Sequence, residues 1–157
     1  MIVAILCPGP SLARFGGGSH SLTIGVNRAA TAFPCGVWAA GDIPLVEAIK
    51  DNVLGSPILF TTANAAAILR DNRKAWRGGV EEFESLYDGA ENVLRWNMFT
   101  ATAALWYAAH CGASMVRVYG ADWSGTKDFD GVAAGMNRSD ARWEMEAGIW
   151  NAMVLAL

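Results

Sequence analysis

Five short segments of the chain are mainly apolar and are separated by turns and polar stretches. The first of them, Ile2–Cys7, shows no alternation of apolar and polar residues. A continuous apolar run of this length is typical of a strand that is buried on both faces, as in the centre of a parallel sheet. The five predicted strands are Ile2–Cys7, Leu22–Val26, Gly36–Ala40, Ile58–Thr61 and Met115–Tyr119.

Helical segments alternate with these strands. Ala63–Arg77 and Thr100–His110 are rich in alanine, the strongest helix former. Two further helices are predicted, one from about Pro44 and one from Ser139 towards Leu157. In the second, Arg142 and Glu146 are one turn apart and can form an ion pair, which needs no functional explanation. Strands that alternate with helices predict an α/β fold, here a three-layer, Rossmann-like, mainly parallel sheet with helices on both faces.

Three stretches are less regular. Gly78–Gly89 is interpreted as a loop with a small strand or helix around Phe83–Tyr87, and Val93–Trp96 as a further strand. Lys127–Met136 is polar and rich in glycine, which predicts a mobile loop. Since no internal repeat or linker divides the chain, residues 1–157 are expected to form a single nucleotide-binding-type domain.

A tight Pro-Gly-Pro-Ser turn follows the first strand directly, at Pro8–Ser11. In a parallel sheet this turn lies at the carboxyl end of the strand, where open α/β sheets bind ligands. Gly9 would allow a ligand to approach the backbone closely, and Ser11 is a suitable N-cap for a short helix whose N–H groups could face a phosphate. A turn of this kind also begins many α/β domains that bind nothing there, so both interpretations stay open.

Polar residues follow four of the predicted strands at the same kind of position. Because the carboxyl ends of parallel strands lie along one edge of the sheet, these residues are expected to lie near a common site. Each also has a purely structural interpretation, as a helix cap or a turn residue. The four residues are Ser11, Asn27, Asp42 and Asp122.

The composition is that of a globular chain with a large core. Hydrophobic residues make up 53% of it and charged residues 17%, which suits a sheet covered on both faces. No apolar run approaches the roughly 20 residues of a membrane span, and Met1 leads into the first strand without a basic signal region. Cys7, Cys35 and Cys111 lack paired spacing, which predicts reduced thiols in a cytoplasmic protein that does not enter a membrane.

The net charge of -3 gives no overall electrostatic basis for binding nucleic acid. One basic cluster has helical spacing, and a solvated helix face is its expected role. It consists of Arg70, Arg73, Lys74 and Arg77. The seven tryptophans are dispersed, which favours core or interface positions over a stacking platform and leaves homo-oligomerisation open.

The order of the motifs resembles that of a known superfamily of Rossmann-like proteins. This superfamily includes bacterial sialyltransferases, 6-hydroxymethylpterin diphosphokinase-like proteins and small phage or prophage relatives. The resemblance extends over residues 1–125, with unmatched stretches between the motifs. The motifs are Gly9-Pro10-Ser11-Leu12, Asn27 after the second strand, Thr100 at the start of an alanine-rich helix, and Gly120-Ala121-Asp122.

The resemblance implies that these motifs bind a nucleotide. Gly9 and Ser11, with Pro10 between them, would lie against its phosphate or ribose. Asn27 would form a hydrogen bond with the nucleotide. Thr100 would contact the phosphate side or the base side of the pocket.

Acidic residues and a histidine complete the set of candidates. The resemblance implies that Asp122, which follows Gly120, faces ribose hydroxyls or loop backbone, and that Asp42 faces a metal-bound phosphate. Asp42 is therefore a candidate Mg²⁺ ligand and a candidate catalytic residue. His20 is the other catalytic candidate, because a histidine in a Gly/Ser loop can act as an acid or base if the loop folds over the pocket.

Two function hypotheses follow. The first is a nucleotide-dependent transferase that uses either a sugar nucleotide, for example of the cytidine monophosphate type, or a nucleoside triphosphate with Mg²⁺. The second is a non-catalytic, phage-derived nucleotide-binding protein. The chain has no histidine after His110 and no tyrosine after Tyr119, whereas the sialyltransferases use both downstream of the last motif, and this difference favours the second hypothesis.

Overall fold

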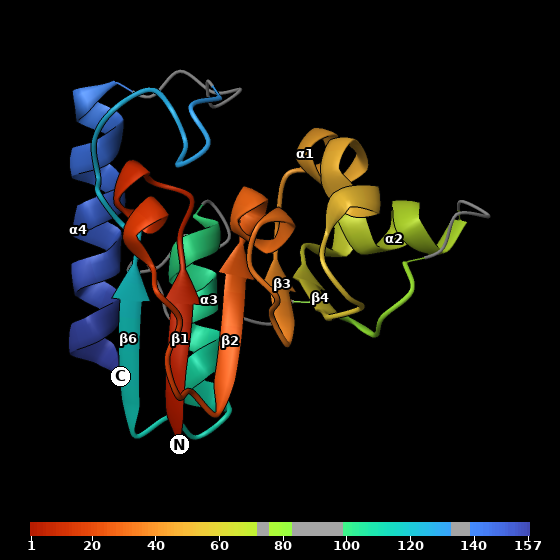
Figure 1. Cartoon of the computed structure of the whole chain (residues 1–157), viewed down its shortest axis with the longest axis horizontal. Helices are drawn as coiled ribbons and strands as arrows, with labels where there is room; N and C mark the ends of the chain where they lie inside the picture. The colour runs from red at the N-terminus through yellow and green to blue at the C-terminus, as the bar shows by residue number, and fades with distance from the viewer. Residues whose placement is uncertain (72–75, 83–98, 133–138) are drawn as a thin grey trace.

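The computed structural model describes residues 1–71, 76–82, 99–132 and 139–157 of the chain. Six strands form one sheet, in which every neighbouring pair is parallel (Figure 1). The strands are β1 Ile2–Leu6, β2 Leu22–Val26, β3 Val37–Ala39, β4 Ile58–Thr61, β5 Val80–Glu82 and β6 Met115–Tyr119.

The strand order is β5-β4-β3-β2-β1-β6, so the direction of the winding reverses once, at β1. Strands β2 to β5 follow one another on one side of β1, and β6 lies on its other side. The register aligns Leu6 of β1 with Tyr119 of β6 and with Gly25 of β2. The turns that leave β1 and β6 therefore lie beside each other, at the topological switch point where open α/β sheets form a ligand crevice.

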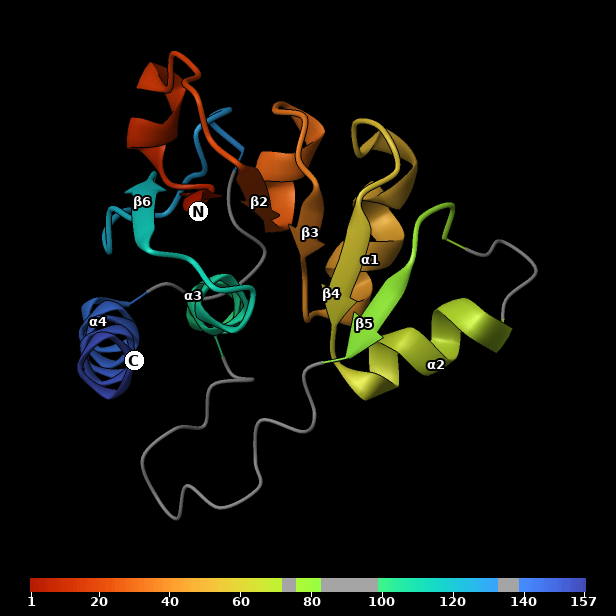
Figure 2. The ribbon, with the colours of Figure 1, turned by 90° about the horizontal axis from the view of Figure 1, so that it is seen from below.

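Helices cover both faces of the sheet, as Figures 1 and 2 show. Helices α3 and α4 lie on one face, and α1 and α2 lie on the other. Three short 3-10 helices, η1 to η3, follow β1, β2 and α1. Their bounds are α1 Ile43–Ile49, α2 Ala63–Asp71, α3 Thr100–His110, α4 Asp140–Ala156, η1 Pro10–Arg14, η2 Asn27–Thr31 and η3 Lys50–Asn52.

The central strand β1 is buried on both faces, as its unbroken apolar run predicts. Val3 and Ile5 belong to the core under α3 and α4, whereas Ala4 and Leu6 pack on the opposite face against Leu12 of η1. All four β1 residues from Val3 to Leu6 are fully buried. The α/β, three-layer, Rossmann-like fold predicted from the sequence is thereby confirmed.

Several predicted boundaries differ from the structure. The alanine-rich helix is described over Ala63–Asp71, and the described residues Trp76 and Arg77 are not helical. The Trp76 indole N–H donates to the Pro57 carbonyl at 2.9 Å. Within Gly78–Gly89, which the sequence predicts as a loop with a small strand or helix, β5 lies at Val80–Glu82. The expectations for Phe83–Tyr87, Val93–Trp96, Arg73 and Lys74, and for the end of the predicted loop at residues 133–136, lie outside the described residues.

The described part of the loop predicted at Lys127–Met136 is attached to the rest of the fold. The Phe129 N–H donates to the Pro8 carbonyl at 2.8 Å, and Asp130 forms an ion pair with Arg28 of η2. These contacts place residues 121–132 above the carboxyl ends of the strands (Figure 1). Among the described helices, none is long and apolar enough to cross a membrane.

Candidate functional site

A pocket lies at the carboxyl edge of the sheet, where the turns after β1, β2, β3 and β6 meet the first turns of α3 and α4. Its volume is about 100 Å³. This is smaller than the roughly 300–1,000 Å³ of typical ligand pockets and suits a group of phosphate size. Predicted site residues that line it are Gly9, Asn27, Asp42, Thr100, Gly120 and Asp122.

Glycine is required at positions 9 and 120 for a structural reason that the sequence does not reveal. A Cβ on Gly9 would lie 2.5 Å from Asp122 Oδ2 and closer still to the Gly120 carbonyl oxygen. Gly120 has a φ of 72°, and a Cβ there would overlap the Cys7 carbonyl. The two glycines therefore allow the β1 and β6 turns to touch. Gly9 also lines the pocket, and its role in the close approach of a ligand stays a prediction.

Asp122 fixes this junction through its side chain. Its Oδ2 accepts the backbone N–H of Ser11 at 2.8 Å, within η1. Ser11 is thus not the N-cap that the sequence predicts, since Gly9 occupies the cap position and the Ser11 N–H already has an acceptor. The carboxylate of Asp122 faces loop backbone, which is one of the two orientations that the resemblance implies.

Asn27 enters the pocket with a rare backbone conformation. Its φ is 50°, in the left-handed region that non-glycine residues seldom adopt. Its carbonyl oxygen accepts the indole N–H of Trp38 at 3.1 Å, which anchors the backbone from beneath. Its side-chain Oδ1 is buried and has no hydrogen-bond partner among the described residues. Such a buried acceptor costs about 1–3 kcal/mol, a cost that a ligand hydroxyl or amino group would remove.

The amino terminus of α3 also faces the pocket. Phe99, Thr100 and Ala101 line it, and Phe99, at the cap position, has no side-chain cap bond. An apolar cap leaves the first N–H groups of this 11-residue helix without a side-chain acceptor. Free N–H groups and the positive end of the helix dipole favour a phosphate or another anion at this point.

Three pocket residues come from the first two turns of α4, where the sequence predicts only a structural ion pair. Arg142 Nε donates to Glu146 Oε1 at 3.2 Å, so the predicted pair is present. The same guanidinium lies over the Phe99 ring, 5.1 Å from its centroid, and Trp143 lines the pocket beside it. Arg142 therefore places a positive charge next to the amino terminus of α3.

Three carboxylates also line the pocket, those of Asp42, Asp122 and Glu146, and that of Glu146 forms the ion pair with Arg142. Asp42 occupies the N-cap position of α1 without forming a side-chain cap bond. Across the described ranges, no three histidine, cysteine or acidic side chains are grouped closely enough to hold a metal ion. Mg²⁺ commonly binds one or two protein carboxylates together with substrate phosphates, and Asp42 at the pocket rim fits that mode.

Cys7 lines the pocket but is not equipped as a nucleophile. Burial, followed by the charges of Glu146 and Asp122, raises the pKa of its thiol to about 12. The thiol therefore stays protonated at neutral pH, and only a thiolate would attack a substrate or bind a metal. Carboxylates remain as the candidate bases among the described residues that line this pocket.

Three predicted site residues, Pro10, Ser11 and His20, lie outside the pocket. The His20 ring lies 6.1 Å from that of Tyr119 and 6.3 Å from that of Phe15, and His20 does not line the pocket. Its loop returns to the amino end of β1, where the Ser21 N–H donates to the Ile2 carbonyl, so it does not fold over the pocket. Pro10 is exposed at the start of η1.

Sequence reasoning missed Trp123, which has a φ of 47° and lines the pocket directly after Asp122.

No family model, no curated protein and no solved structure matches this chain. The assignment of a function therefore depends on the geometry of the site.

Proposed function

We propose that the pocket binds the phosphate part of a nucleotide and that the chain is a nucleotide-dependent transferase. The observation that supports this most directly is the convergence of the uncapped α3 terminus, the Arg142 guanidinium and the unpartnered Asn27 amide oxygen on one pocket at the switch point. The first two favour an anion, and the third suits a hydroxyl or amino group next to it. A nucleotide combines both features in one molecule.

The dimensions of the pocket suggest how such a ligand would sit. A phosphate would lie near Thr100 and Arg142, while ribose and base would lie beside Trp123 and Trp143, which line the same pocket. These aromatic side chains offer flat surfaces for a base. The donor would therefore bind with its reacting phosphate at the amino terminus of α3.

In a glycosyl transfer, the acceptor hydroxyl oxygen bonds to the sugar carbon while the bond from that carbon to the nucleotide phosphate oxygen breaks. The hydroxyl proton passes to a pocket carboxylate, and Asp42, Asp122 and Glu146 are the candidates. The α3 terminus and Arg142 stabilise the negative charge that the leaving nucleotide gains. In a diphosphate transfer, Asp42 would hold Mg²⁺ that arrives with the nucleotide.

A second candidate function is binding without catalysis. It is favoured by the absence of a histidine among the described residues that line the pocket and by the protonated state of Cys7. Turnover separates the two candidates. Release of the free nucleotide from a sugar nucleotide, or of AMP from ATP, in the presence of wild-type protein supports the transferase, because many transferases also use water slowly as an acceptor.

Binding is tested first, by the thermal unfolding of the protein with CMP, CDP, UDP, GDP and ATP, each with and without Mg²⁺. A ligand at 100 times its Kd is expected to stabilise the fold by about 2.7 kcal/mol. Arg142→Gln and Asn27→Gly are expected to remove most of this gain. Glycine at position 27 keeps the positive φ free of strain, so that variant removes only the side chain.

Matched controls are available on the surface. Arg117→Gln alters an exposed arginine of β6, and Asn52→Ala alters an exposed asparagine of η3, both outside the pocket. These variants are expected to respond to nucleotides as the wild type does. If no nucleotide stabilises the wild type, or if the pocket variants and the controls respond alike, the proposed function is wrong.

A further inference from the structure

A second recess lies at the open edge of the sheet, beside the carboxyl half of β6. Its volume is about 410 Å³, within the roughly 300–1,000 Å³ range of ligand pockets. It is separate from the carboxyl-edge pocket but shares Gly120, Ala121 and Trp123 with it. The function proposed above uses only the first pocket.

Four half-buried aromatic side chains form the wall of this recess, namely Phe15, Tyr119, Trp123 and Trp150. They come from the loop after η1, from β6 and its turn, and from α4. The rings lie in two pairs: the centroids of Phe15 and Tyr119 are 4.7 Å apart, and those of Trp123 and Trp150 are 5.7 Å apart. Four aromatic rings from separate elements present flat apolar surfaces to one space, which suits a ring-shaped ligand.

Polar groups in the recess limit the charge of that ligand. Arg14, exposed at the end of η1, is the one charged side chain among the described residues that line it, and Ser11 adds a hydroxyl. Since β6 lies at one edge of the sheet, a row of its backbone N–H and C=O groups also has no partner among the described strands. An arginine beside aromatic surfaces is complementary to an anion, and most of all to a carboxylate, which it can bind through two N–H groups.

Trp123 connects the two spaces. Its φ of 47° is rare for a bulky residue, and such a conformation costs about 1–3 kcal/mol that the surroundings must balance. The strained backbone places one indole so that it lines both the pocket and the recess. Backbone strain of this kind is concentrated at ligand clamps and active sites.

We propose that the recess is a second ligand site, for a six-membered ring compound with a flat apolar face and one carboxylate. Its position next to Trp123 makes that compound the second substrate of the proposed transfer. This role rests on the proposed function, whereas binding in the recess does not require a nucleotide. Sugar acids and aromatic acids both combine a ring with a carboxylate, the two features that the recess is proposed to bind.

Saturation-transfer NMR with the full chain tests the proposal. The probes are D-glucuronate for sugar acids, 4-hydroxybenzoate for aromatic acids, and methyl glucoside as a neutral ring of similar size. At least one acid is expected to bind, and Arg14→Gln is expected to raise its Kd by about tenfold, the loss expected for one charge-assisted contact of about 1.4 kcal/mol. Arg14 is exposed, so this variant is expected to fold normally.

Trp150→Leu is expected to weaken the binding of the acid and of the neutral ring alike. Arg117→Gln alters an exposed arginine of β6 and is expected to weaken the binding of neither. The proposal is overturned if no ring compound binds, or if Arg14→Gln binds the acids as the wild type does. A nucleotide panel on the same samples separates the two ideas: acid binding without any nucleotide binding supports the recess and overturns the transferase.

Discussion

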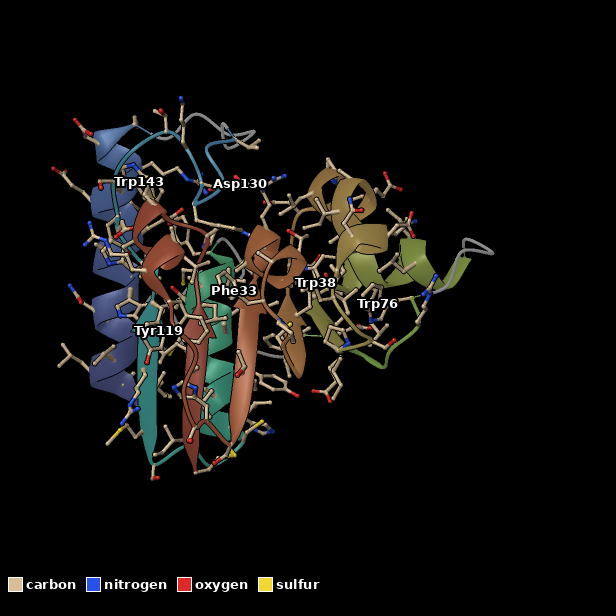
Figure 3. All side chains as sticks on the ribbon, in the orientation of Figure 1. Phe33, Trp38, Trp76, Tyr119, Asp130 and Trp143 are labelled. Carbon is tan, nitrogen blue, oxygen red and sulfur yellow. The ribbon has the colours of Figure 1, made fainter. Side chains whose placement is uncertain are left out.

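Two groups of tryptophans lie at different ends of the sheet, and they differ in what covers them. Trp38 and Trp76 pack together against the β3 and β4 side of the sheet, 5.0 Å apart, and Trp38 is fully buried. Trp123, Trp143 and Trp150 surround the far end of the sheet and are all half-buried. Figure 3 shows Trp38 and Trp76 on one side of the molecule and Trp143 at the upper end of α4 on the other.

The difference lies in what covers each group. Around Trp38, helices α1 and α2 close the face of the sheet, and Val46, Leu59 and Leu69 complete one apolar cluster. The residues after β1 form only η1 and a loop, and none of the long helices that the structure describes covers the same face at β1 and β6 (Figure 2). We infer that the tryptophans of the first group stabilise the fold, whereas those of the second group line the cavities that the missing cover leaves open.

The largest expected effect follows from Trp38. Trp38→Ala removes the largest fully buried side chain and the indole donor to the Asn27 carbonyl, and is expected to lower the free energy of unfolding by about 3–5 kcal/mol. Denaturant unfolding followed by circular dichroism measures this loss. Trp123→Ala, at the half-buried end, is expected to cost clearly less. Equal losses in the two variants would contradict the division into a core group and a cavity group.

A smaller effect is expected at the junction between the β1 and β6 turns. Gly9→Ala forces a methyl group against the Gly120 carbonyl and the Asp122 carboxylate, and overpacking of this kind costs about 1–3 kcal/mol. The same unfolding measurement tests it. Gly16→Ala is the matched control, because a Cβ on Gly16 meets nothing within 4 Å. If Gly9→Ala is as stable as Gly16→Ala, the close contact between the two turns is not present in solution.

These residues also show what the sequence could and could not predict. The apolar runs and the alanine-rich segment predicted β2, β4, β6 and α3 with the observed ends, because local patterning determines these elements. Because parallel strands end at one edge, Ser11, Asn27, Asp42 and Asp122 were predicted to lie near a common site. Asn27, Asp42 and Asp122 line one pocket, whereas Ser11 lines the neighbouring recess. Both predictions needed only local chemistry and the parallel arrangement.

The remaining features depend on strand order and on long-range packing. The sequence around Gly9 does not indicate that Gly120 is its neighbour in space. The two residues are in contact only because β6 pairs with β1. Arg142 and Glu146 were recognised as an i, i+4 pair, but their position at the pocket follows from the way α4 packs beside α3. A local sequence pattern shows which residues share one face of a helix, but it gives no information on the elements against which that face packs.

The smallest expected effect concerns the attachment of residues 121–132 above the pocket. Although partial burial opposes it, the hydrogen bond and charge of Arg28 lower the pKa of Asp130 below its ordinary value. A carboxylate with a lowered folded-state pKa stabilises the fold at pH values above its unfolded-state pKa of about 3.9, and this stabilisation is lost as the pH falls through the folded-state value. The ion pair thus holds the segment at neutral pH and releases it in acid.

Asp130→Asn isolates this contribution, because asparagine keeps an oxygen for the Val132 N–H and loses the charge. The Asp130 side chain is 27% exposed, so solvent screening limits the expected loss at pH 7 to less than about 1 kcal/mol. The difference in unfolding free energy between the wild type and the variant is expected to vanish at pH values below the folded-state pKa. Glu47→Gln, at an exposed position of α1, is expected to show no such pH-dependent difference. A difference between the wild type and Asp130→Asn that stays constant from pH 7 into acid would mean that the charge of Asp130 does not hold the segment.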